Sequence, residues 1–365
     1  MEGNRVDGAW ASGRGALRFG FGAVVDVPLR QLGSRAEDLE LLGFDRLWLP
    51  DERLTRNVYT GLTVCALNTS RMQLGIAVTN PYTRNVALTA AAAASIDELA
   101  DGRLSLGFGA GGGLAHYGIE RSRPAVAVRE AVEVVRLLLS GQTVTYEGRH
   151  VRMREARLDF AALRQIPIYV AARGPRLLEL AGEVGDGAII GGFASPAGID
   201  HARAAIGRGL ERSGREWKDL DLVSWLYTCV ADDPATARRA VSRLVTTSLV
   251  TSRPILDSIG VRIPQRLLAC LESSGWSVGP EAIDECSRHL SDEILDAFSL
   301  AGTPGECARK LRQIAATGVR EIAFVALPAP GQSVEQLARR LATEVIPEVR
   351  SGLSGEAVSP GQGGA

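Results

Sequence analysis

The chain has 365 residues, of which 45% are hydrophobic and 23% are charged, a composition typical of globular rather than disordered or fibrous proteins. Its 41 basic and 42 acidic residues leave a formal net charge of −1, so no basic field favours a nucleic-acid partner. No segment has the roughly 18–20 consecutive apolar residues of a membrane span, and no signal-peptide core precedes the first apolar run. We therefore expect a cytoplasmic protein with neither nucleic acid nor membrane as partner.

The five cysteines are widely spaced and form no CxxC pair, which predicts buried free thiols rather than a disulfide framework. The four histidines never pair at the spacing of metal ligands, and no known metal motif is present, so no metal site is predicted.

Short apolar runs alternate with segments of helical periodicity along the chain. The predicted strands are residues 17–25, 46–49, 72–78, 104–108, 166–172, 187–190, 220–230 and 321–326. The predicted helices are residues 29–42, 60–68, 86–99, 125–139, 176–184, 199–213 and 334–349, with a long helical stretch after the seventh strand. Eight strand–helix units predict a (β/α)8 TIM barrel, although a doubly wound open sheet would also show this alternation.

Three parts of the chain depart from the alternation. Residues 141–165 contain a β-hairpin pattern around Glu147-Gly148. Residues 234–300 are too long for one crossover helix and predict a helical insertion before strand eight, over the carboxyl-terminal mouth of the barrel, where it would shape specificity. Residues 1–16 and 351–365 are rich in Gly, Ser or Pro and predict disordered ends around one domain, residues 17–350.

In a TIM barrel the active site lies at the carboxyl ends of the strands, so the residues that follow each predicted strand are the candidates. Several of these loops are rich in glycine, which permits close approach of a flat ring and lets backbone N–H groups bind an anion. Gly107, Gly109 and Gly112 also match a dinucleotide fingerprint, but the residues after them indicate a loop instead of the required helix.

Four segments carry a family resemblance: NVYTGLTVCALNTSRMQLGIAVTNPYTRN, IDELADGRLSLGFGAG, IPIYVAARGPRLLELAGEVGDGAI and LAGTP. They resemble the luciferase-like flavin and deazaflavin oxidoreductases, and most of all the methylenetetrahydromethanopterin reductases that use coenzyme F420. The VTNPYTR segment is the part most specific to the deazaflavin branch. The resemblance covers about residues 17–233 and 298–349.

The resemblance implies a dimeric (β/α)8 barrel with a bulge and a non-prolyl cis peptide after strand three, here between Ala77 and Val78, which presses on the cofactor ring. It also implies cofactor contacts near the strand ends, and the glycine-rich loops agree with it. The implied cofactor-binding residues are Ala77, Val78, Thr79, Asn80, Gly109, Ala110, Gly111, Ala172, Arg173, Gly174, Pro175, Gly191 and Gly192. Asp51 would flank the same ring.

The chain departs from the family pattern at three positions. Gly22 and Gly112 stand where relatives commonly carry an acidic residue, and Glu52 stands where they often carry histidine. By position, Glu52 becomes the candidate general acid or base, with Asp51 tuning or relaying protons beside it. A surface carboxylate at a helix start is the alternative for Glu52.

The sequence therefore predicts an F420-dependent oxidoreductase that transfers a hydride between C5 of the deazaflavin and a C=N or C=C bond of a small molecule. Two alternatives stay open. One is an FMN-dependent monooxygenase, because the same barrel hosts both cofactors. The other is a non-catalytic barrel kept as a binding or dimer subunit, because the usual acids are missing at Gly22 and Gly112.

Overall fold

The computed structural model describes residues 16–52 and 54–356. Its strands are β1 Arg18–Gly22, β2 Arg46–Leu49, β3 Gln73–Thr79, β4 Leu104–Phe108, β5 Val144–Glu147, β6 Arg152–Ala156, β7 Ile168–Ala172, β8 Gly187–Gly191, β9 Asp221–Val230, β10 Ser299–Gly302 and β11 Glu321–Ala326. Its helices are α1 Leu29–Leu41, α2 Val58–Asn68, α3 Val86–Leu99, α4 Pro124–Leu139, α5 Pro175–Val184, α6 Pro196–Ser213, α7 Pro234–Thr251, α8 Gln265–Ser273, α9 Pro280–Ser287, α10 Asp292–Phe298, α11 Pro304–Ala315, α12 Val334–Arg340 and α13 Ile346–Glu356. No helix in this part of the chain is long and apolar enough to cross a membrane.

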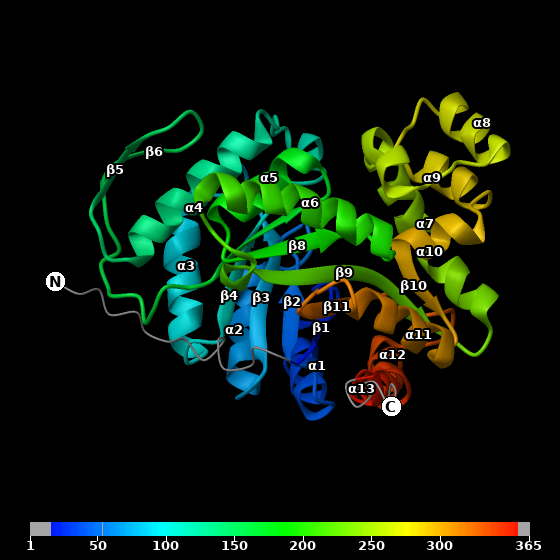
Figure 1. The fold of residues 1–365 in the computed structure, drawn as a ribbon. Coiled ribbons are helices and arrows are strands. Elements are labelled where there is room, and N and C mark those ends of the chain that lie inside the picture. The colour runs from blue at the N-terminus through cyan, green and yellow to red at the C-terminus, as the bar shows by residue number, and fades with distance from the viewer. Residues whose placement is uncertain (1–15, 53, 357–365) are drawn as a thin grey trace, which may run out of the picture.

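Eight parallel strands close into a barrel surrounded by helices (Figure 1). Pairing runs from β9 through β11, β1, β2, β3, β4 and β7 to β8, and the β8–β9 ladder closes the ring. The predicted TIM barrel is thus confirmed, and the open doubly wound sheet is excluded. Because every strand runs the same way, all eight carboxyl ends open at one mouth.

The additions to the barrel are a hairpin and an insertion. The predicted hairpin is the antiparallel pair β5–β6, and Figure 1 shows it on the opposite side of the barrel from α8 and α9. The predicted insertion is helical from α7 to α10, but it ends in a strand that the sequence did not indicate. This strand, β10, pairs in parallel with the carboxyl-terminal half of β9, which extends beyond the barrel ladder.

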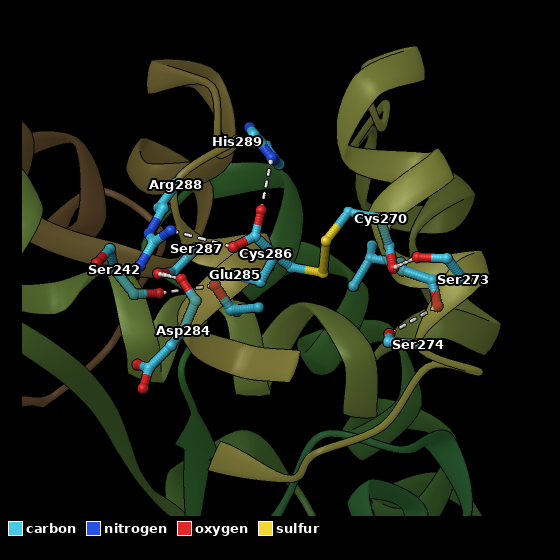
Figure 2. Close-up of a disulfide and its surroundings, with 12 residues drawn as sticks. Ser242, Cys270, Ser273, Ser274, Asp284, Glu285, Cys286, Ser287, Arg288 and His289 are labelled. Carbon is cyan, nitrogen blue, oxygen red and sulfur yellow. Dashed lines mark hydrogen bonds and ion pairs between the residues drawn. A yellow bond between two sulfur atoms is a disulfide. The ribbon is translucent and has the colours of Figure 1, made fainter. Parts of the chain in front are cut away.

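The expectation of free thiols is wrong for one pair of cysteines. Cys270 on α8 and Cys286 on α9 form a disulfide, with their Cα atoms 5.6 Å apart (Figure 2). The two helices pack against each other and so bring together residues separated by 16 positions, which spacing alone does not reveal. Cys65, Cys229 and Cys307 are free and buried, as predicted, and burial raises the pKa of the Cys65 thiol to about 12.

The predicted disorder of the carboxyl-terminal tail is wrong for residues 351–356, because α13 continues through them. This helix packs on α11, a contact that Gly- and Ser-rich composition does not reveal. The rest of both expected disordered ends lies outside the described residues, apart from residue 16.

Inside the barrel, large aromatic side chains pack opposite glycines. The lumen cluster consists of Trp48, Ala77, Tyr169, Ile189, Val223 and Ala323, all buried. Trp48 and Tyr169 fit only because glycines face them: a Cβ on Gly75 would lie 2.1 Å from the Trp48 ring, and one on Gly187 would lie 2.2 Å from the Tyr169 ring. The lumen is therefore a filled core rather than a pore.

Below this cluster, at the amino ends of the strands, lies a set of charges that we call the lumen ion network: the half-buried Arg18 and the buried Arg46, Asp221 and Glu321. Arg18 contacts Asp221 at 2.6 Å, and Arg46 contacts Glu321 at 3.0 Å. The lumen rings complete it, because the Tyr169 hydroxyl donates to Asp221 and the Trp48 indole N–H donates to Glu321, both at 2.7 Å. Each carboxylate thus has both an ionic and a neutral partner.

The pKa values of this network follow from burial and pairing. Burial opposes ionisation of Asp221, but Arg18 and Arg46 outweigh it and hold the pKa of this carboxyl below its usual value. Burial raises the pKa of the Tyr169 hydroxyl above its usual value, and the neighbouring carboxylates add to the effect, so the hydroxyl stays a donor.

We predict that Asp221→Asn lowers the free energy of unfolding at pH 7 by roughly 3–5 kcal/mol, because it leaves Glu321 as the single carboxylate partner of the two arginines in the network. The folded-state pKa of Asp221 is depressed, so its contribution is present above the unfolded pKa and is lost as pH falls below about 4. Urea denaturation across pH 2–7 should therefore show less acid dependence in the variant. Exposed Asp200→Asn is the control, and equal losses in both variants would contradict the prediction.

Candidate active site

The carboxyl end of β3 forms one wall of the mouth. The register with β4 shifts between Ile76 and Thr79, and the Ala77–Val78 peptide bond is cis, so the bulge and cis peptide implied by the resemblance are confirmed. Val78 is half-buried and packs on the lumen cluster. Glycine on β4 makes room for it, since a Cβ on Gly109 would lie 2.6 Å from Val78 Cγ2.

Asp51 and Thr79 come together at this wall. The Thr79 hydroxyl donates to Asp51 Oδ2 at 2.7 Å, and Thr79 is fully buried while Asp51 is half-buried. Asn80 is buried too, and its amide oxygen accepts from the backbone N–H groups of Tyr82 and Thr83. The side-chain group of Asn80 that could bind a ligand is therefore its NH2 group, which would donate. Glu52 is exposed in the loop between β2 and α2.

The loop after β4 crosses the mouth next to Asn80. The Gly109 N–H donates to the Thr79 carbonyl, and Gly111 adopts a φ of +75°, which glycine tolerates best. Arg121 donates to the Gly111 carbonyl at 3.1 Å, while Ala110 is half-buried. A 3₁₀ turn, Leu114–Tyr117, follows instead of an α-helix, so the loop is not a dinucleotide fingerprint.

The third element of the mouth is the start of α5. Its N-cap is Gly174, Pro175 is its first residue, and no side chain caps this terminus, so backbone N–H groups of the first turn face outward. Ala172 ends β7 beside it. A Cβ on Gly174 would meet no atom within 4 Å, which leaves open space at the helix start.

Arg173 forms hydrogen bonds with the helical insertion. Its guanidinium donates to the Ser248 carbonyl at 3.3 Å and to the Thr251 hydroxyl at 2.7 Å, both on the last turns of α7. Its side chain also runs past Gly191, whose Cβ would lie 3.6 Å from Arg173 Nε. The insertion therefore reaches the mouth through α7, and the cation complements the carboxyl end of that helix.

Gly191 ends β8 next to this arginine, and Gly192 follows it. Gly192 has a φ of +72° and donates to the Trp225 carbonyl at 3.0 Å. A Cβ there would approach the Tyr227 ring at 3.5 Å. The predicted residues from β3, β4, β7 and β8 thus share one mouth.

Sequence reasoning missed the contribution of β9. Trp225 and Tyr227 are half-buried between fully buried neighbours, and a Cβ on Gly22 would lie 2.9 Å from Trp225 Cη2. The indole therefore occupies the space above Gly22, whereas Gly112 has no atom within 4 Å of its Cβ position. The alternation of Asp221, Val223, Trp225 and Tyr227 was the available signal for this inward face.

The mouth offers carboxylate, hydroxyl and backbone groups but no metal site. Within residues 16–52 and 54–356 no group of three or more His, Cys, Asp or Glu side chains could hold a metal ion. His116 is exposed.

Comparisons with known proteins agree with this architecture. The model of the luciferase-like monooxygenase family matches residues 11–321. A 5,10-methylenetetrahydromethanopterin reductase of Methanolobus tindarius is 32% identical over 335 residues, which are 90% of this chain and all of the relative. The structure of the coenzyme F420 dependent tetrahydromethanopterin reductase from Methanopyrus kandleri superposes with a TM-score of 0.80 at 25% identity, covering 91% of this chain and 99% of that one.

A monooxygenase from Streptomyces bottropensis superposes with a TM-score of 0.65 at 19% identity, over 91% of this chain and 99% of that one, and so shows the fold alone. The chain belongs to the luciferase-like monooxygenase family. The resemblance identified from its sequence is confirmed.

We predict that Gly109→Ala lowers the free energy of unfolding by about 1–3 kcal/mol, because the new methyl group must displace Val78 from its packing. Gly112→Ala, three residues along the same loop, has open space and is the control. Denaturant unfolding of both variants measures the difference. Equal stability of the two would contradict the packing described here.

Proposed function

We propose that this chain is an F420-dependent oxidoreductase that transfers a hydride between C5 of the deazaflavin and a C=N or C=C bond of a small molecule. The observation that carries the proposal is the combination of the Ala77–Val78 bulge, the facing glycine Gly109 and the uncapped start of α5 at one mouth. The F420-dependent reductase that superposes on the whole barrel supports it.

The mouth fits a flat ring with an anionic tail. Ala77, Val78, Thr79 and Asn80 would contact the ring on one side, and Gly109, Ala110 and Gly111 would line it where the absence of large side chains permits close approach. The segment from Ala172 through Pro175, which leads into the first turn of α5, would bind the phosphate with backbone N–H groups, since helix starts favour anions. Gly191 and Gly192 would lie next to that phosphate.

When bound, F420 supplies a two-electron hydride carrier, and the protein contributes binding, orientation and exclusion of water. Thr79 fixes the orientation of Asp51 through their hydrogen bond, so the carboxylate would be held in position to accept a proton or hydrogen bond at the mouth. Glu52, adjacent in the chain and exposed, would exchange protons with solvent.

The test is a pair of titrations of the purified protein, one with F420 and one with FMN. We expect micromolar or tighter binding of F420 and at least tenfold weaker binding of FMN, a difference of about 1.4 kcal/mol. The reverse preference would support the FMN-dependent monooxygenase, and binding of neither would support the non-catalytic barrel.

A single variant isolates the phosphate contact. Gly174→Asp should weaken F420 binding at least tenfold, because a carboxylate at the N-cap occupies the N–H groups and repels an anion. Capping stabilises the helix, so loss of binding would not come from unfolding. Gly305→Asp, placed in open space in the first turn of α11, is the control, and equal effects of the two variants would contradict the assignment.

The cytoplasmic location remains a prediction. The three buried free thiols support it, whereas disulfides such as Cys270–Cys286 persist mainly in oxidising compartments. The net charge of −1 supports a small molecule rather than nucleic acid as partner.

We also propose a homodimer that forms through α2 and α3. Leu67 and Leu88 are 67% and 60% exposed on these neighbouring helices, and Leu99 adds a third apolar side chain at 41% exposure. Such a group of exposed leucines favours burial against a second copy.

Sedimentation velocity should show a dimer for the wild type and a shift toward monomer for Leu88→Glu, because the charge would be buried without a partner. Val278→Glu changes an equally apolar side chain, 56% exposed, in the loop between α8 and α9, and should leave the dimer intact. A monomeric wild type would refute the dimer, and a dimer unaffected by Leu88→Glu would refute this interface.

A further inference from the structure

Trp225 lies on β9 at the mouth end of the lumen cluster and has no part in the function proposed above. It lies on β9 directly above Val223 in the inward-facing series, and it packs on the lumen cluster together with Val78 and Ala171. Val223 is fully buried, whereas Trp225 is half-buried, so the indole is the last ring of the lumen core and presents surface to the mouth.

The indole reaches across the barrel toward β1. Trp225 pairs in register with Ala323 of β11. Gly22 of β1 pairs with Val325, which lies two residues further along β11 toward the mouth. The short side chain of Ala323 lets the ring pass over it, and the ring edge then lies over Gly22, where a Cβ would be 2.9 Å from Cη2 and 3.2 Å from Cζ2. Any side chain at position 22 would therefore displace the indole.

Apolar side chains pack beside the indole, because Val78 and Ala171 lie with Trp225 on the lumen cluster. No hydrogen bond from the indole N–H is present within residues 16–52 and 54–356. At the mouth, the Asp51 carboxylate accepts from the Thr79 hydroxyl, and the Arg173 guanidinium donates to Ser248 and Thr251 on α7. A charged substrate group stacked on the indole would lose water against Val78 and Ala171, so a neutral face is favoured there.

Resting on the proposed function, we propose that Trp225 is the substrate platform and that the hydride acceptor is a neutral, planar, conjugated molecule that stacks on its indole. A conjugated C=N or C=C compound presents a flat face of this kind, and aromatic stacking orients it without a charged contact. Gly22 is the residue that makes the platform possible. Trp225 is thus a specificity-determining residue that binds substrate rather than the cofactor phosphate.

The test uses two probes of the same skeleton: trans-4-phenyl-3-buten-2-one, which is neutral, and trans-cinnamate, which is anionic at pH 7. Calorimetric titrations with each probe are run at saturating oxidised F420, and F420 affinity is measured for every variant. We expect the wild type to bind the enone at least tenfold more tightly than cinnamate, which is about 1.4 kcal/mol. Trp225→Leu should weaken enone binding at least tenfold, whereas Trp225→Phe should retain most of it.

Trp217→Phe, which changes a tryptophan at the other end of the barrel next to the start of β9, is the matched control and should change neither affinity. Gly22→Ala provides an independent route, because its methyl group would push the indole aside. It should weaken enone binding in the wild-type background but have no further effect in Trp225→Leu, as expected for two coupled residues.

The outcomes separate the two proposals. Normal F420 affinity in all variants, with enone binding that depends on Trp225 and Gly22, supports the platform. Normal F420 affinity with enone binding unaffected by Trp225→Leu, or with cinnamate preferred, overturns the platform and leaves the proposed function intact. Loss of F420 affinity in Trp225→Leu would place the indole against the cofactor instead and also overturns it. A wild type that binds no F420 overturns the proposed function and this inference together.

Discussion

The lumen ion network is the constraint on which the rest of the barrel depends. It joins the first residues of β1, β2, β9 and β11, elements that are up to 303 positions apart in the chain, through two buried carboxylates and two arginines. Buried charges are tolerated only when each one is paired, so the network specifies one relative placement of these four strands. Because it closes the amino-terminal end of the lumen, the opposite end is left to form the only mouth among the described strands.

Above that network, size complementarity determines the form of the mouth. The rings of Trp48 and Tyr169 fill the lumen opposite Gly75 and Gly187, where a side chain would collide with them. The ring of Trp225 packs over Gly22 in the same way. Val78 is placed against Gly109 in the same way. The glycines are therefore structural counterparts of particular large residues. The proposed cofactor site rests on the small side chains that this pattern leaves at Gly109 and at the start of α5.

Much of this could be predicted from sequence, because strands and helices of a TIM barrel leave local patterns. All eight barrel strands, the β5–β6 hairpin and the helical insertion follow from periodicity, and the Ala77–Val78 bulge follows from the VTNPYTR resemblance. Long-range pairings leave no such pattern. The partners Arg46 and Glu321, the Cys270–Cys286 disulfide and the contact of Arg173 with α7 all depend on where distant elements meet. Trp225 could not be predicted from the general rule that TIM-barrel sites lie in the loops after the strands, because this residue lies within β9.

The most direct measurement is a crystal structure of the protein with F420 bound. We predict that the deazaflavin ring lies against the Ala77–Val78 bulge with Gly109 to Gly111 along it, and that the phosphate lies within hydrogen-bond distance of the backbone N–H groups at the start of α5. A ring bound outside this mouth, or a phosphate held at another helix start, would contradict the account.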